Sequence, residues 1–277
     1  MTDDKKRILS IISRQGGKSR LYKELIPLFP NHLYYAEVFG GAGWVLLNKN
    51  ESVIEIFNDL DSNIVNLFRV LRDFPGEFVN RLQLDIVSRK TFDDYKALPF
   101  HLLDPIDRAV KWYYVYYNSY NADMTSLLQR KVHTNPNRFN TRLPELVRVL
   151  TDRLINVVME DLPFQDFFQK YDNKDFFYYL DPPYFEMHGY EIPFEEKDHV
   201  LLRDTLLSIK GKFLLSYNDH PYVRELYKDP KFHIQTIQTS YQAANRPGAY
   251  KEKTNKGHEL VITNYLVSNK SLPTNSL

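Results

Sequence analysis

Residues 32–59 read HLYYAEVFGGAGWVLLNKNESVIEIFND, and this stretch decides the expected fold. The apolar and aromatic run from His32 to Phe39 is typical of a buried strand, and it leads into a glycine-rich turn. The segment from Ala42 to Asn48 has the pattern of a helix that follows this turn, and Ser52 to Phe57 is typical of a second strand. A strand, a glycine turn, a helix and a strand in succession predict a parallel α/β sheet.

The strand pattern returns after residue 150. Further strands are expected at Leu154 to Met159, Phe176 to Leu180, Lys212 to Tyr217, Phe232 to Thr239 and Glu259 to Val267. The loop between the last two is too short for a crossover helix, so we expect an antiparallel hairpin at the end of the sheet. Residues 73–150 are helix-like and polar with scattered prolines. We therefore expect a core domain of residues 1–72 and 151–277 with an inserted, mainly helical domain at 73–150.

The composition is that of an ordinary folded protein, with 277 residues, 43% hydrophobic and 26% charged. The absence of cysteine excludes a disulfide framework and thiolate metal sites, and no metal site is predicted. The chain shows no signal-peptide pattern and no apolar run of about eighteen residues, which predicts a cytoplasmic location and no membrane role. Because the net charge is only +1, a nucleic-acid surface would have to come from locally concentrated charge, and basic residues do predominate from Arg130 to Arg153.

The tetrapeptide Asp181-Pro182-Pro183-Tyr184 directly follows an expected aromatic strand. Its two prolines end the strand, remove two amide donors and fix φ, so carbonyl oxygens and the Asp181 carboxylate can point into a cleft. Two acceptors on an exocyclic amine would draw its nitrogen toward tetrahedral geometry and free the lone pair for attack on a sulfonium methyl. Tyr184 would stack on the base. The competing interpretation is a simple strand-to-loop stop, because Pro-Pro and Asp are both common in turns.

Two upstream features favour the catalytic interpretation. The segment Glu37-Val38-Phe39-Gly40-Gly41-Ala42-Gly43 ends the first strand, and its small residues permit a sharp turn and the close approach of a ligand. Asp59 ends the second strand, where an acid can accept hydrogen bonds from ribose hydroxyls. The alternative role for Asp59 is to cap the helix near Asn63, although Asp61 and Ser62 are better spaced for that.

The order of these motifs resembles that of the Dam-type (D12 class) DNA adenine-N6 methyltransferases. The matching segments are Gly16-Gly17-Lys18, Phe39-Gly40-Gly41-Ala42-Gly43, Asp59, Asp181-Pro182-Pro183-Tyr184 and Glu259-Leu260-Val261-Ile262-Thr263-Asn264. The resemblance covers nearly the whole chain. It implies a Rossmann-like sheet dependent on S-adenosylmethionine (SAM), with an inserted target-recognition domain. The implied activity is methyl transfer to N6 of a flipped adenine in double-stranded DNA at a specific site.

The same resemblance implies which residues hold SAM. They are Arg14, Lys18, Glu37, Phe39, Gly41, Gly43, Asp59, Asp161 and Asp181. Asp59 is assigned to the ribose and Asp161 to the adenine of the cofactor, whereas Asp181 lies where cofactor and target base meet. Arg14 replaces a residue that is usually aromatic in the family, and its alternative role is a solvated charge.

Residues for DNA contact are expected chiefly in the inserted domain. The candidates are Asn118, Asn121, Arg130, Lys131, Arg138 and, from the late loop, Arg246. Basic side chains suit phosphates and asparagines suit base edges. The alternatives are a solvated charged face for the basic run and a mobile loop around Arg246. The neighbouring residues Trp112, Tyr116 and Tyr120 have helical spacing, which is typical of a buried core.

Three other functions fit the same residues. Transfer to cytosine N4 or to an RNA adenine would use the same acceptor geometry, and a catalytically idle DNA-binding homologue would keep the fold. The absence of a cysteine nucleophile excludes the cytosine-C5 mechanism. The resemblance also leaves open a companion restriction endonuclease as partner, and the sequence does not specify the oligomeric state.

Overall fold

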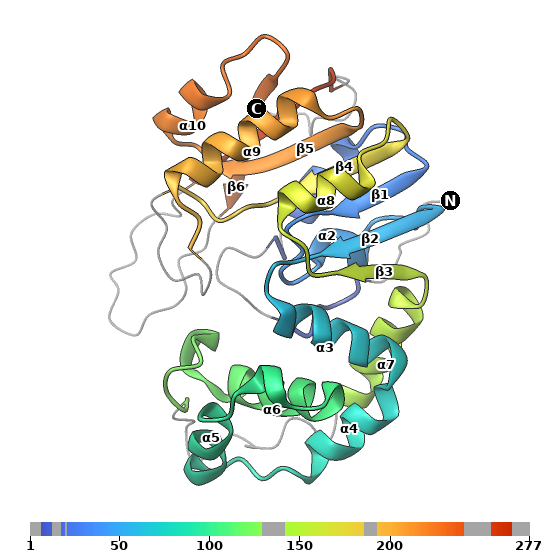
Figure 1. Ribbon diagram of the computed structural model, residues 1–277, viewed down its shortest axis with the longest axis vertical. Coiled ribbons are helices and arrows are strands. Elements are labelled where there is room, and N and C mark those ends of the chain that lie inside the picture. The colour runs from blue at the N-terminus through green and yellow to red at the C-terminus, as the bar shows by residue number, and fades with distance from the viewer. Residues whose placement is uncertain are drawn as a thin grey trace. The chain divides into compact units, whose positions relative to one another are not determined.

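The computed structural model describes residues 7–12, 18–19, 21–128, 142–185, 193–240 and 256–267 (Figure 1). Within these residues, seven strands form a sheet in the order β3-β2-β1-β4-β5-β7-β6. The strands are β1 (Tyr34–Glu37), β2 (Ile54–Asn58), β3 (Val157–Glu160), β4 (Phe176–Leu180), β5 (Lys212–Asn218), β6 (His233–Ser240) and β7 (Lys256–Thr263).

The sheet is parallel except at one end. The pairs β1–β4, β2–β3 and β4–β5 are parallel, whereas β7 is antiparallel to both β5 and β6. The predicted Rossmann-like α/β class with an antiparallel final hairpin is therefore confirmed. In the hairpin, β7 lies between β5 and β6, so β7 is the strand that joins the hairpin to the parallel part of the sheet.

The chain divides into two compact units. The first comprises residues 1–19 and 41–161, and the second comprises residues 20–40 and 162–277. The expected division into residues 1–72 with 151–277 around an insertion at 73–150 stays a prediction. No helix in the described segments combines the length and the apolar character needed to cross a lipid bilayer.

The first unit is mainly helical around β2 and β3. Its α-helices are α2 (Trp44–Asn48), α3 (Ser62–Asp73), α4 (Pro75–Leu84), α5 (Arg89–Lys96), α6 (Pro105–Asn118) and α7 (Leu143–Leu154), with 3-10 turns η2 (Phe100–Leu102) and η3 (Tyr120–Ala122). Helices α3, α5 and α6 are preceded by the N-cap residues Asp61, Ser88 and Asp104, whose side chains accept amide hydrogens of the first turn. Helix α6 buries Trp112 and Tyr116, which stack at 5.1 Å, whereas Tyr120 lies beyond its end and is exposed.

Three charged side chains form a buried cluster in this unit. Glu55 on β2 accepts hydrogen bonds from Lys49 and, at 2.6 Å, from Nη1 of Arg153 on α7. Nη2 of Arg153 also donates to the carbonyl oxygen of Leu46 at 2.5 Å. All three charged residues are at most 6% exposed. Because buried charges are tolerated when paired, this cluster joins α2, β2 and α7.

The second unit holds the rest of the sheet. Its helices are α1 (Tyr22–Leu25), η1 (Ile26–Leu28), α8 (Phe164–Tyr171), α9 (Glu196–Ser208) and α10 (Pro221–Leu226). Helices α8 and α9 lie together over β4 and β5 in Figure 1. Phe168 on α8 packs on Tyr178, and His199 on α9 packs on Tyr217, so both helices cover one face. On the other face Phe29 packs on Phe177 at 4.5 Å.

Several predicted boundaries differ from the observed ones. The strand expected from Leu154 begins at Val157 instead, because Leu154 is the last residue of α7. The last strand begins at Lys256 and ends at Thr263, before the predicted limit at Val267. Helices α8 and α10 were not predicted, since they have only eight and six residues. An apolar spacing of Phe164, Phe167 and Phe168 was the signal for α8.

Candidate active site

The tetrapeptide from Asp181 to Tyr184 leaves the sheet at the carboxyl end of β4, and we call it the catalytic turn after the role predicted for it from the sequence. All five residues of β4 are buried, so the strand fixes the point at which the turn begins. Oδ1 of Asp181 accepts a hydrogen bond from Oγ of Ser216 on β5 at 3.2 Å. Oγ of Ser216 in turn lies 3.0 Å from the hydroxyl of Tyr179. Because Ser216 and Tyr179 are both buried, this chain of hydrogen bonds orients the half-buried carboxylate.

The rest of the catalytic turn is also held by side chains of the sheet. The hydroxyl of Tyr217 on β5 donates to the carbonyl oxygen of Pro183 at 3.1 Å. The hydroxyl of Tyr184 donates to Oε1 of Glu259 on β7. The rings of Tyr184 and Tyr217 stack with centroids 5.1 Å apart, so Tyr217 covers one face of Tyr184. A target base that stacks on Tyr184 would therefore have to lie on the opposite face of the Tyr184 ring.

Three carboxylates surround the tyrosines at this edge of the sheet. Burial, followed by the charges of Asp181, Glu37 and Glu259, raises the pKa of Tyr179 well above its ordinary value. Burial and the charges of Asp181 and Glu259 do the same to the pKa of Tyr184. Both phenols therefore keep their protons and act as donors. The concentration of negative charge suits a cationic ligand such as a sulfonium.

Glu37 and Phe39 lie at and beyond the carboxyl end of β1. Glu37 is 2% exposed and accepts a hydrogen bond from the hydroxyl of Tyr35 at 3.2 Å. Phe39 contacts the rings of Phe164 and Phe194, each with centroids 5.9 Å away. The end of β1 therefore provides a buried acidic group at Glu37 and, two residues later, an aromatic surface at Phe39.

Asp59 lies at the end of β2 in the first unit and closes the glycine turn. Its Oδ2 accepts the amide hydrogen of Gly41 at 2.6 Å, and its Oδ1 accepts that of Asp61 at 2.8 Å. Asp61 caps α3, accepting the amide hydrogen of Asn63 at 3.0 Å, so Asp59 does not have the capping role. Gly41 and Gly43 have φ of 50° and 66°, a conformation that favours glycine.

The remaining residues that are predicted to bind the cofactor differ in their exposure to solvent. Asp161 directly follows β3 and is exposed, whereas Lys18 is only 5% exposed. Burial lowers the pKa of Arg108, and the charges of Asp61 and Asp161 oppose that shift, which places Asp161 in the electrostatic environment of Arg108. Arg14 lies outside the described residues.

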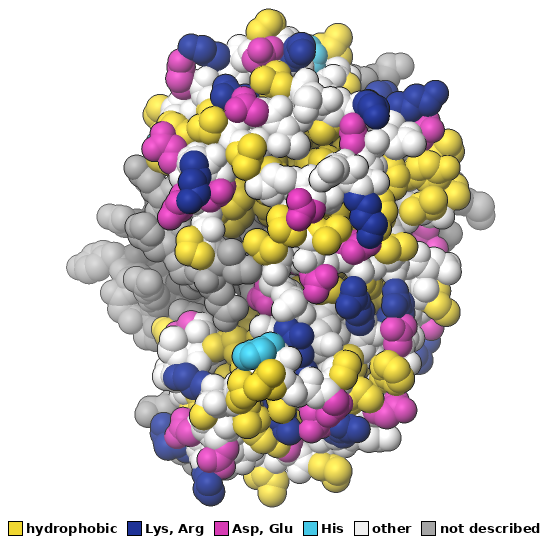
Figure 2. Space-filling model, in the orientation of Figure 1, with side chains coloured by type: hydrophobic (Ala, Val, Ile, Leu, Met, Phe, Trp, Pro, Cys, Tyr) yellow, Lys and Arg dark blue, Asp and Glu magenta, His cyan; other side chains and the backbone are white. Residues whose placement is uncertain are grey.

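The DNA-contact candidates are largely outside the described part of the chain. This holds for Arg130, Lys131, Arg138, Arg246 and the side chain of Asn121. Asn118 is fully buried, and its amide donates to the carbonyl oxygen of Tyr114 at 2.9 Å, which favours a structural role. On the face drawn in Figure 2, basic and acidic side chains of the described residues alternate, with no continuous basic area.

Four residues of the site had no individual role assigned from the sequence, although Ser216 and Tyr217 lie in a segment that the resemblance puts beside the base pocket and Glu259 begins a matching segment. They are His199, Ser216, Tyr217 and Glu259. Glu259 stands at the start of the apolar run Leu260 to Ile262, and a lone acid beside buried strand residues is a signal for a special role. Asn218 adds a further polar group, because its buried Oδ1 has no hydrogen-bond partner among the described residues.

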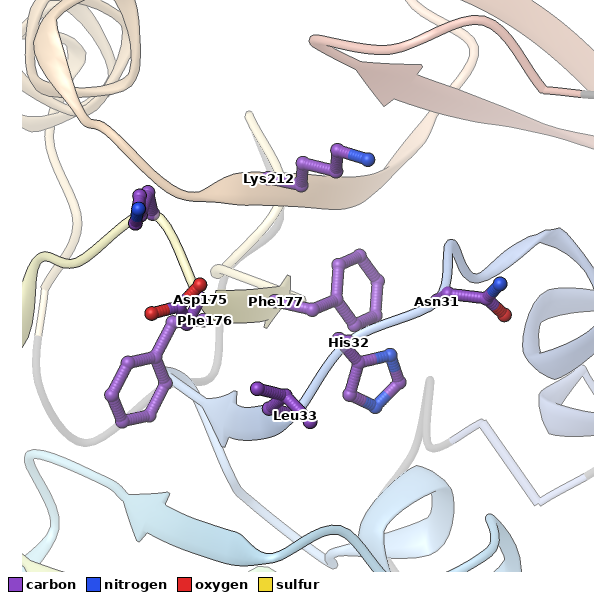
Figure 3. A pocket seen from close by; sticks show the side chains of 8 residues that line it. Asn31, His32, Leu33, Asp175, Phe176, Phe177 and Lys212 are labelled. Carbon is purple, nitrogen blue, oxygen red and sulfur yellow. The ribbon is translucent and has the colours of Figure 1, made fainter.

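A pocket of about 270 Å³ lies away from this site (Figure 3). His32, Phe177 and Lys212 line it, and these residues stand at or near the amino ends of β1, β4 and β5. The catalytic turn follows the carboxyl end of β4. In open α/β sheets ligands bind outside the carboxyl ends of the strands, so the pocket belongs to the opposite edge.

Comparison with known proteins places these residues in context. The model of the D12 class N6 adenine-specific DNA methyltransferase family matches residues 15–243. The chain is 28% identical to the type II methyltransferase M1.LlaDCHI of Lactococcus lactis subsp. cremoris, over 90% of this chain and 93% of that relative. It is 24% identical to the type II methyltransferase M.CviBI of Paramecium bursaria Chlorella virus NC1A, over 92% and 99%. The modification methylase StsI of Streptococcus sanguinis is 27% identical over 66% of this chain and 30% of its own length.

Proposed function

The chain belongs to the D12 class N6 adenine-specific DNA methyltransferase family, and from this premise we propose that it methylates specific sites in duplex DNA with SAM as donor. Family membership establishes an enzyme that uses a methyl donor and acts on adenine in DNA. The identity of the donor, the catalytic residues and the cellular setting are the parts that we propose.

The observation that carries the proposal is the anchoring of Asp181 by Ser216 at the carboxyl end of β4. With Oδ1 held, the carboxylate can accept one N–H of the target amine in a fixed direction, and a carbonyl oxygen of the catalytic turn accepts the other. Withdrawing both hydrogens from the ring plane frees the nitrogen lone pair for attack. On attack the nitrogen would become cationic as the bond between the methyl carbon and the donor's sulfur breaks, which leaves the sulfur as a neutral thioether. The nitrogen would then lose a proton, and the nearby carboxylates stabilise its positive charge until it does.

The target adenine must leave the DNA stack to reach the catalytic turn, at a cost of a few kcal/mol. We infer that Tyr184 offsets part of this cost by stacking on the base, with Pro182 and Pro183 holding the turn rigid. Asn218 is a further candidate for hydrogen bonding to the base, because its Oδ1 is without a partner among the described residues.

SAM supplies a methyl group on a positively charged sulfur. The residues at this edge of the sheet fit a sulfonium compound, since Glu37 and Asp181 provide negative charge and Phe39 provides an aromatic surface. Asp59 stands at the end of β2, and its carboxylate, a group that only accepts hydrogen bonds, is of the kind that binds a ribose hydroxyl. We assign the same cofactor role to Gly41, Gly43 and Asp161. Lys18 and Arg14 complete this set by resemblance.

We assign DNA binding to Asn121, Arg130, Lys131, Arg138 and Arg246, and leave Asn118 out because it is buried. An enzyme that modifies DNA acts where DNA is found, on which ground we infer a cytoplasmic location. The type II methyltransferases among the relatives support a restriction endonuclease as the companion.

The decisive test uses labelled SAM and duplex DNA, followed by digestion and identification of the methylated nucleoside. We expect N6-methyladenine from the native protein and none from Asp181→Ala, with SAM binding retained in isothermal titration. Asp175→Asn, a carboxylate change at the opposite end of β4, serves as the matched control and should leave transfer unchanged. N4-methylcytosine, a preference for RNA, or full activity of Asp181→Ala would each refute the proposal.

A further inference from the structure

We propose that His199 is a positioning residue for methyl transfer, which it serves by fixing the catalytic turn through Tyr217. This inference rests on the proposed function of the turn. His199 lies on α9, eighteen residues before Tyr217 in the sequence, and does not itself contact the turn through a hydrogen bond that the structure describes.

Two hydrogen bonds connect the histidine to the turn. Nδ1 of His199 lies 2.5 Å from the hydroxyl oxygen of Tyr217, and that hydroxyl donates to the carbonyl oxygen of Pro183 at 3.1 Å. A tyrosine hydroxyl has one hydrogen to give. Because the hydroxyl hydrogen of Tyr217 goes to the carbonyl oxygen of Pro183, the hydrogen between Tyr217 and His199 must come from the histidine. Nδ1–H of His199 then donates to the hydroxyl oxygen of Tyr217. The chain of donors then runs in one direction, from α9 to the turn.

The surroundings of His199 favour the neutral form of the ring. The residue is 2% exposed. The rings of Phe194 and Phe185 meet it edge-on, with centroids 4.6 Å and 5.6 Å away. Burial lowers the pKa of His199 to about 4, against the opposing charge of Asp198. At neutral pH the imidazole therefore carries one hydrogen, which the proposed donation to Tyr217 assigns to Nδ1.

The carbonyl of Pro183 is a sensitive point of the catalytic turn. Pro182 and Pro183 have no amide hydrogen, so their carbonyl oxygens are the backbone groups through which this segment can be held. The orientation of the Pro183 carbonyl also sets the peptide plane that leads into Tyr184. Small displacements of reacting groups are costly, since a misplacement of about 1 Å can lower a rate about 100-fold.

The turn is held from both faces of the sheet. Tyr217 pairs with Leu260, and Asn218 pairs with Glu259, so Tyr217 and Glu259 point to opposite faces. Ser216 and Glu259 hold Asp181 and Tyr184 from one face, whereas Tyr217 and His199 hold Pro183 from the face covered by α9. Without the His199 contact, the Tyr217 hydroxyl could rotate away from Pro183.

The test measures kcat and KM for SAM in four variants with duplex DNA as substrate. His199→Leu and Tyr217→Phe remove the chain of donors, and we expect kcat to fall about tenfold or more with KM for SAM within about twofold of the native value. His199→Asn places an amide N–H near the position of Nδ1 and should restore most of kcat. Tyr227→Phe is the matched control, because Tyr227 is 1% exposed and its hydroxyl has no partner among the described residues.

Each outcome decides the inference. Native kcat in His199→Leu or Tyr217→Phe would overturn it while leaving the proposed function intact, and so would a loss in His199→Asn equal to that in His199→Leu. If His199→Leu fails to fold, Tyr217→Phe and His199→Asn still decide, because each changes fewer contacts. A native protein without activity on DNA would instead refute the proposed function.

Discussion

The amide nitrogen of Gly41 lies 2.6 Å from Oδ2 of Asp59, so the acid at the end of β2 closes the glycine turn that follows β1. This hydrogen bond gives Asp59 a structural role in addition to the proposed contact with the ribose. A carboxylate that holds a glycine turn is itself held, so the direction of its oxygens is fixed.

Asp59→Ala should weaken SAM binding by about tenfold or more, because it removes a ribose acceptor and loosens the turn at Gly41. Isothermal titration measures the affinity. Asp61→Ala is the control, since it removes the cap of α3 and should lower the free energy of unfolding by about 1 kcal/mol without changing SAM affinity. Equal affinities in both variants would contradict the assignment of Asp59.

Ser216→Ala should lower kcat about tenfold with SAM affinity retained, because Asp181 loses the hydrogen bond that fixes Oδ1. Single-turnover kinetics with duplex DNA measure the effect. Ser208→Ala removes an exposed hydroxyl from the end of α9 and should leave the rate unchanged. A native rate in Ser216→Ala would show that Asp181 is oriented without this contact.

Tyr184 and Glu259 should be energetically coupled. Tyr184→Phe takes one hydrogen bond from a carboxylate that is 1% exposed, at an expected cost of about 1–3 kcal/mol. Urea unfolding of Tyr184→Phe, Glu259→Gln and the double variant forms a double-mutant cycle. We expect an interaction energy above about 0.5 kcal/mol, whereas strictly additive losses would argue against the contact.

Stability should fall as the pH falls between about 6.5 and 4, because of His199. Its pKa is lowered from 6.5 to about 4 by burial, so in this window the unfolded chain binds a proton that the folded chain does not. The stabilisation is therefore present above pH 6.5 and lost progressively toward pH 4. The groups that face the ring are Asp198 on α9, Tyr217 on β5 and two phenylalanines.

Urea unfolding at pH 7.5 and pH 5.0 checks this prediction. His199→Asn cannot take up the proton, so it should lose less stability between the two pH values than the native protein does. The same pH dependence in both proteins would assign the effect to other groups.

The sequence predicted the parts of the site that are local in the chain. β4 was expected at Phe176 to Leu180 and is observed at those residues, because its buried run ends at two prolines. The roles of Asp59 and Asp61 were separated by their spacing from Asn63, and the structure agrees that Asp61 is the cap. Local spacing was sufficient in both cases.

The contacts that hold the catalytic turn could not be predicted in the same way. Glu259 and Tyr184 are 75 residues apart, and they meet only because β7 inserts between β5 and β6. An antiparallel hairpin was expected, but which of its strands borders β5 is a property of the sheet order. The register of β5 and β7, which points Glu259 and Tyr217 to opposite faces, is also set by tertiary packing.

Glu55→Gln should destabilise the first unit strongly. The carboxylate of Glu55 pairs with Lys49 and Arg153, and all three side chains are at most 5% exposed. Removing its charge leaves two buried cations without their counterion, a change that typically costs about 3–5 kcal/mol. Asp94→Asn is the control: it breaks the exposed ion pair with Lys90 and should leave the urea midpoint unchanged. Because the cluster contains none of the residues assigned to SAM or to the catalytic turn, folded Glu55→Gln should keep native kcat. A variant as stable as the native protein would show that water or a relaxed packing compensates the two cations.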